Sequence, residues 1–186
     1  MRRLILVSSF LVVGAGASVA QDPPAAASAT AAGADPTAPS AAGHVDVSKI
    51  LSTNDAQKIL GEPVKPPTPL NLETKDGYYS KCNYYSAKSV RSLLVRVREA
   101  SEGSLDPLKE FEQVKASGGV MKPVDQLGDE AGLFSGMPEN GLPPNVIMLY
   151  VVKGKFFITI GIGGMSNEAT ALDKAKEVAR KILTQV

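Results

Sequence analysis

The chain has 186 residues, of which 44% are hydrophobic, and its 20 basic and 19 acidic residues give a net charge of +1. This balance excludes an electrostatic hold on nucleic acid, which needs a concentrated basic surface. A single histidine and a single cysteine exclude zinc, haem and iron–sulfur centres built from several such ligands, and leave no partner for an internal disulfide.

The first twenty residues have the three parts of a secretory signal. Arg2 and Arg3 precede an apolar run at residues 4–13, and small residues fill positions 14–20. We expect cleavage after Ala20 and a periplasmic or extracellular product. The next residue is not the cysteine that a lipid anchor requires. An uncleaved signal that tethers the protein to the membrane is the alternative.

Residues 21–44 are rich in Ala, Pro, Ser, Thr and Gly, and such a composition buries too little apolar surface to order a chain. We therefore expect a disordered leader that ends at His44. Apolar periodicity covers residues 45–186, which is the usual length of one domain. A histidine outside that domain is not held against a nucleophile.

The domain is predicted to begin with a helix at residues 52–60. Capping residues precede it, apolar side chains share one face, and Gly61 suits a left-handed C-cap. Several prolines follow, and they predict an irregular loop as far as Leu72.

Two strands are predicted at residues 78–86 and 92–100, joined as a hairpin. The second strand alternates, because Leu93, Val95 and Val97 fall on one face while Arg96 and Arg98 fall on the other.

A second helix is predicted from Pro107, with Asp106 as its cap and a Gly-Gly pair at 118–119 as its end. Leu108, Phe111 and Val114 are expected to face the core. Residues 124–134 indicate a tight turn that leads into a short strand.

The last part of the chain predicts a hairpin and a helix. Strands at residues 146–152 and 156–162 flank a turn at Gly154, and alternate residues give them one very apolar face. An amphipathic helix at residues 167–184 is expected to cover that face, with Ala169, Leu172, Ala175, Ala179 and Ile182 among its inward residues. The whole predicts an α+β fold with a mostly antiparallel sheet of about five strands flanked by helices.

No motif assigns catalysis, a metal or a cofactor. The glycines at 161–164 lack the spacing of a nucleotide loop. Asp125, Asp129 and Glu130 lack the spacing of a calcium loop, and we interpret them as turn residues. We therefore expect a protein that is not an enzyme. Two alternatives stay open, an enzyme that uses paired carboxylates or Cys82 and a structural protein of the envelope.

Tyrosine and arginine gather in the first predicted hairpin, and these residue types are enriched at binding interfaces. The sequence therefore predicts an exported module that binds a protein or a small ligand through this region. The candidate binding face consists of Tyr78, Tyr79, Tyr85, Arg91, Arg96 and Arg98.

Three segments carry a family resemblance: the helix at residues 51–61 with its Asp-Ala and Ile-Leu-Gly, Cys-Asn-Tyr at 82–84, and Pro-Val-x-x-Leu-Gly-Asp-Glu-Ala at 123–131. With the final strand pair and helix, they resemble small secreted bacterial domains of unknown function, many of them lipoproteins. The layout is similar to the PsbP-like fold, an antiparallel sheet sandwiched by helices. The resemblance implies a binding or accessory role, and it transfers no catalytic residues.

Overall fold

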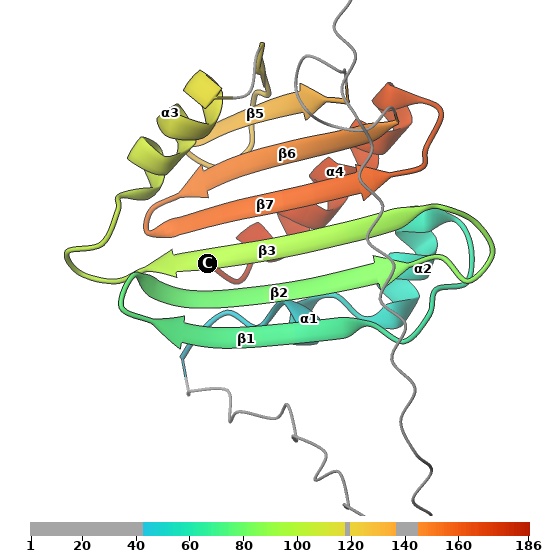
Figure 1. Cartoon of the computed structure of the whole chain (residues 1–186), viewed down its shortest axis with the longest axis horizontal. Helices are drawn as coiled ribbons and strands as arrows, with labels where there is room; N and C mark the ends of the chain where they lie inside the picture. The colour runs from blue at the N-terminus through green and yellow to red at the C-terminus, as the bar shows by residue number, and fades with distance from the viewer. Residues whose placement is uncertain (1–42, 118–119, 137–144) are drawn as a thin grey trace, which may run out of the picture. The chain divides into compact units, whose positions relative to one another are not determined.

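Seven antiparallel strands form one sheet in the order β1-β2-β3-β7-β6-β5-β4 (Figure 1). The computed structural model describes residues 43–117, 120–136 and 145–186. The strands are β1 (Thr68–Thr74), β2 (Gly77–Tyr85), β3 (Ser92–Ala100), β4 (Lys122–Pro123), β5 (Glu130–Ser135), β6 (Val146–Lys153) and β7 (Phe156–Gly163). The helices are α1 (Val47–Ile50), α2 (Thr53–Leu60), α3 (Pro107–Ser117) and α4 (Glu168–Leu183).

The expected α+β class with an antiparallel sheet is confirmed, and the sheet has more strands than the five or so predicted. The predicted signal, almost all of the predicted leader and the glycine pair at 118–119 lie outside the described residues. The added strands are β1, where a loop was predicted, and the two-residue β4. Pro69 is compatible with β1 because that strand lies at the edge of the sheet, where a missing N–H does not interrupt the ladder.

One side of the sheet is covered by helices. Figure 1 shows α1, α2 and α4 behind the strands, and α4 packs on β6 and β7 as the apolar pattern of that hairpin predicts. Ile158, Ile160 and Ile162 are fully buried there. Each buried aliphatic side chain of this size contributes about 1.5–3 kcal/mol. This side holds the main core of the protein.

The inward faces of two helices differ in part from those predicted. Along α4, Ala171 and Val178 are buried, whereas Ala169 is exposed. Along α3, Phe111 is buried but Leu108 is 47% exposed, because only one narrow side of this helix reaches the sheet. Ala175, Ala179 and Ile182 of α4 and Phe111 of α3 are buried as predicted, so each predicted stripe is wrong at its first residue only.

The ends of α2 follow the capping pattern of the sequence. Ser52 Oγ accepts a hydrogen bond from the Asp55 N–H, and the Asp55 carboxylate accepts one from the Ser52 N–H at 2.9 Å. Gly61 closes the helix with φ +73°, a conformation that glycine adopts without steric cost. The positions where α2 begins and ends are therefore determined by the few residues at each end.

Candidate functional site

Among the described residues, no helix covers β1, β2 and β3 on the side of the sheet opposite α4, and α3 covers only the part beside β6 and β7 (Figure 1). Strict alternation along β2 and β3 decides which side chains lie on this side, because Leu93, Val95 and Val97 all point into the main core. We call the following residues the open face: Tyr79, Lys81, Asn83, Tyr85, Leu94 and Arg96.

The open face mixes apolar, aromatic and cationic groups. Tyr85 is 49% exposed, and the other members are half-buried. Lys81 is paired with Arg96 across β2 and β3, so two positive charges lie side by side. Leu70 and Leu72 of β1 extend the same side as neighbours of Lys81 and Tyr79, and both are more than half exposed.

Three polar atoms beneath this surface have no hydrogen-bond partner among the described residues. They are Asn83 Oδ1, Arg96 Nε and Thr159 Oγ1. Thr159 is only 4% exposed, and its neighbours in the sheet are Arg96 on β3 and Tyr150 on β6. Buried polar groups are nearly always hydrogen-bonded in native proteins. These three atoms could therefore form hydrogen bonds with a bound molecule or with water.

The structure divides the six residues predicted as a binding face. Tyr79, Tyr85 and Arg96 lie together on the open face. Tyr78 lies on the helix-covered side, Arg98 is buried beneath the segment that leads into α3, and Arg91 lies at the far end of the sheet beside α2. Half of the predicted set thus shares one surface.

Tyr78 is buried against His44. The two rings are stacked with their centroids 4.4 Å apart, and His44 Nδ1 lies 2.8 Å from Glu99 Oε2. His44, predicted as the last residue of the leader, therefore packs on the domain. Burial raises the pKa of the Glu99 carboxyl, but hydrogen bonds from Lys155 and His44 outweigh it, and the pKa lies below its usual range. These contacts fasten the start of the domain to β2 and β3.

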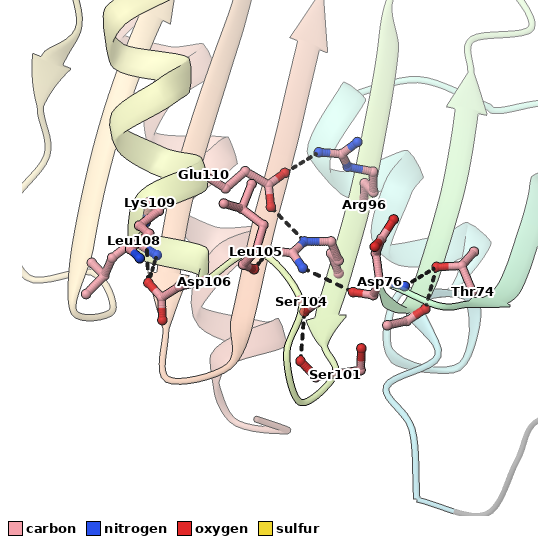
Figure 2. Close-up of polar contacts among 12 residues, drawn as sticks. Thr74, Asp76, Arg96, Ser101, Ser104, Leu105, Asp106, Leu108, Lys109 and Glu110 are labelled. Carbon is pink, nitrogen blue, oxygen red and sulfur yellow. Dashed lines mark hydrogen bonds and ion pairs between the residues drawn. The ribbon is translucent and has the colours of Figure 1, made fainter.

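Arg98 links the sheet to α3 through hydrogen bonds with Glu110, Asp76 and Leu105. Figure 2 shows Glu110 on α3, Arg96 on β3 and the segment at Leu105 that leads into α3. Its guanidinium is 2% exposed, and Nε donates to Glu110 Oε2 at 2.6 Å. The remaining nitrogens donate to the carbonyl oxygens of Asp76 at 3.3 Å and Leu105 at 2.8 Å. Glu110 also lies 3.5 Å from Arg96. Each of the three guanidinium nitrogens of Arg98 therefore binds a group of the protein itself, and two of these groups lie on α3 or on the segment before it. Arg98 thus holds α3 against the sheet.

Arg91 borders a hollow of about 240 Å³ between the end of α2 and the start of α4. Its guanidinium donates to the carbonyl oxygen of Leu60 at 2.8 Å, and Glu62 lies 3.8 Å away. Lys58 and Lys174 also line the hollow. The Arg91 guanidinium therefore binds the C-terminal end of α2, on the helix-covered side of the sheet.

Cys82 and Asp129, the residues considered as a nucleophile and as a calcium ligand, both lie in environments typical of structural residues. Cys82 is fully buried, and burial raises the pKa of its thiol, so the thiol has neither the charge nor the access of a nucleophile. Asp129 accepts hydrogen bonds from the Gly154 N–H at 2.7 Å and from Lys153 at 2.9 Å, which is the turn role expected for it. Within residues 43–117, 120–136 and 145–186, no three His, Cys, Asp or Glu side chains gather as metal ligands would.

Lys81, Asn83, Leu94 and Thr159 belong to no motif from which they could have been predicted as site residues. Their position follows from the register of β2, β3 and β7, which aligns Lys81, Arg96 and Thr159 across three strands. Alternation along each strand was visible in the sequence, but the pairing of β3 with β7 joins residues 57 to 71 positions apart. That long-range pairing completes the site.

In comparisons with family models, curated proteins and solved structures, nothing matches this chain. In the part of the chain that the structure describes, no helix is long and apolar enough to cross a membrane. The resemblance to small secreted domains stays a prediction.

Proposed function

We propose that the protein is an exported, non-catalytic module that binds a partner protein through its open face. The observation that carries this proposal is the side of β1, β2 and β3 that no described helix covers, where exposed tyrosine and leucine lie around two adjacent cations. A surface that combines exposed apolar and aromatic side chains with arginine is typical of a protein interaction site.

The chemistry of the open face favours a partner surface that carries carboxylates beside apolar groups. Lys81 and Arg96 supply positive charge, and Glu110, which lies 3.5 Å from Arg96, already pairs with Arg98. Tyr79 and Tyr85 supply flat, amphipathic contact area of the kind that dominates binding energy. Complementary charge would raise the rate of association and make it fall with added salt.

The enclosed thiol of Cys82 supports a role without nucleophilic catalysis. Export is supported by the three-part signal in residues 1–20. An enzyme that uses carboxylates, or a structural envelope protein, would not depend on the open face.

The test is affinity capture from the envelope and medium of the cell that makes the protein. The double variant Lys81→Glu/Tyr85→Ala changes the open face, and Arg180→Glu, an exposed position on α4, makes an equal charge reversal on the other side. Lys81 is preferable to Arg96 because a glutamate at 96 would also repel Glu110.

We expect the double variant to bind its captured partner about ten- to a hundredfold more weakly, while Arg180→Glu binds as the unchanged protein does. Raising the salt concentration should weaken the unchanged protein more than the double variant. If both variants retain every captured protein equally, the open face is not the binding surface.

A further inference from the structure

β1 is the edge strand of the sheet, and no described element lies beyond it (Figure 1). Leu70 is 57% exposed and Leu72 is 51% exposed on the side of the open face. Native proteins usually protect edge strands with charge, proline or short length. Here Pro69 and Glu73 lie towards the ends of the strand, and the centre, Leu70-Asn71-Leu72, carries no charge.

The register of β1 shows which backbone groups are free. The turn between β1 and β2 has two residues, because Thr74 pairs with Gly77. Residues that flank such a turn exchange backbone hydrogen bonds, and bonded pairs alternate with non-bonded pairs along an antiparallel ladder. The even-numbered residues of β1 therefore bond β2, and Pro69, Asn71 and Glu73 direct their backbone groups to the free edge. Pro69 agrees with this, since prolines occur in strands where the missing N–H would face solvent.

We propose that the free edge of β1 binds β1 of a second copy of this chain, antiparallel and centred on Asn71. In this register Leu70 of each copy lies opposite Leu72 of the other, so the leucines of both copies form one apolar cluster. Glu73 lies opposite Pro69, where its N–H meets a free carbonyl and its carboxylate meets no like charge.

Other two-fold registers are less favourable. A centre at Glu73 sets two carboxylates opposite each other, and a centre at Pro69 sets two residues without an N–H opposite each other. Centres at Leu70 or Leu72 pair only one leucine with its own copy and set the other against a threonine, Thr68 or Thr74. Centring on Asn71 joins the most apolar surface and keeps like charges apart.

The paired strands would join both sheets into one. Because Leu70 and Leu72 lie beside Lys81 and Tyr79, the two open faces would lie on the same side of the joined sheet. Self-association at β1 does not rest on the proposed function, and its test needs no partner protein.

The first experiment measures the molar mass of the chain, as its own cell processes it, by sedimentation equilibrium between micromolar and several hundred micromolar concentration. We expect twice the mass of one chain. Leu70→Lys/Leu72→Lys should weaken the dimer about a hundredfold or more, because apolar contacts are replaced by four facing charges. Leu108→Lys/Val90→Lys, at sites 47% and 85% exposed, is the matched control and should leave the mass unchanged. A monomer throughout, or a dimer that survives the β1 variant, would overturn the proposal.

The second experiment tests the register with single cysteines. Cys82 is fully buried and does not compete. Non-bonded antiparallel pairs have Cα atoms about 4.5 Å apart, within the range that a disulfide spans. When Leu70→Cys and Leu72→Cys chains are mixed in a glutathione redox buffer, we expect the mixed disulfide to form at least tenfold more than either like pair. Like pairs in equal or greater amount would overturn the register, and circular dichroism shows that each variant is folded.

Discussion

Tyr84 and Tyr85 are consecutive in β2 and lie in opposite surroundings. Tyr84 is fully buried on the helix-covered side, and its hydroxyl donates to the carbonyl oxygen of Leu51. Tyr85 is 49% exposed on the open face. The same contrast separates the two sides of the whole sheet, since one side is filled by aliphatic side chains and the other keeps its charges and exposed leucines.

This contrast shows that the two sides of one sheet meet different physical demands. The helix-covered side buries enough apolar surface to hold the domain together without a disulfide. The open side, where α3 covers only one part, is then free to carry polar groups that a core would exclude. Substitutions on the two sides should therefore differ in kind, and variants of neighbouring residues can measure the difference.

The largest effect is expected at Arg98, where the open side is closed by α3. Arg98→Met leaves the half-buried Glu110 carboxylate and the carbonyl oxygens of Asp76 and Leu105 without their donor. We expect a loss of about 2–4 kcal/mol in the free energy of unfolding, measured by urea denaturation.

Arg96→Met is the control for Arg98, because Arg96 lies two residues away on the same side of β3 and is 37% exposed. Its contact with Glu110, at 3.5 Å, is worth about 0.5 kcal/mol or less. If both variants lose the same free energy of unfolding, Arg98 does not hold α3 against the sheet. Adding Glu110→Met to Arg98→Met should recover part of the loss, because no charge is then left unpaired.

Much of the fold could be predicted because its elements follow local rules. The Ser52 and Gly61 ends of α2, the turn at Gly154 and the apolar face of β7 each depend on a few adjacent residues. β1 was missed because its sequence looks like a loop. A strand with Pro69 is tolerated only at an edge, and whether a strand lies at an edge depends on the pairing of the entire sheet.

The candidate site was predictable only in part, for a related reason. Tyrosine and arginine are enriched at interfaces, and this placed the prediction on the hairpin of β2 and β3, which contributes the open face. Residue type alone cannot separate Tyr78 from Tyr79, because their sides are set by the register of β2 against β3 and by the helices that cover one side. The ring of His44 that covers Tyr78 comes from a segment that composition assigned to the leader.

The adjacent tyrosines provide the next prediction. Tyr84→Phe removes the buried hydroxyl that bonds the Leu51 carbonyl, and we expect a loss of about 1–2 kcal/mol in the free energy of unfolding. Tyr85→Phe should change stability by less than about 0.5 kcal/mol, because its ring is half exposed. Thermal and urea denaturation measure both. A reversed order would contradict the assignment of the two sides.

The smallest effect concerns Asp55, which joins two of the helices on the covered side. The Lys181 ammonium on α4 lies 2.7 Å from its carboxylate, and with the hydrogen bonds from Ser52 it holds the pKa of Asp55 far below its usual range. A carboxyl with a lowered folded-state pKa stabilises the fold fully above the unfolded pKa of about 4, and this stability is lost as the pH falls towards the folded value.

Asp55→Asn should therefore cost about 1 kcal/mol at pH 7, with the difference from the unchanged protein shrinking steadily below pH ~4. Urea denaturation between pH 7 and pH 2.5 measures it. Lys181→Met separates the two causes, because it removes the link to α4 and leaves the capping box of α2 intact. If Lys181→Met flattens the acid dependence as much as Asp55→Asn does, the contact between the helices governs it; if it does not, the cap of α2 does, and acid would loosen α2 before it separates the covering helices.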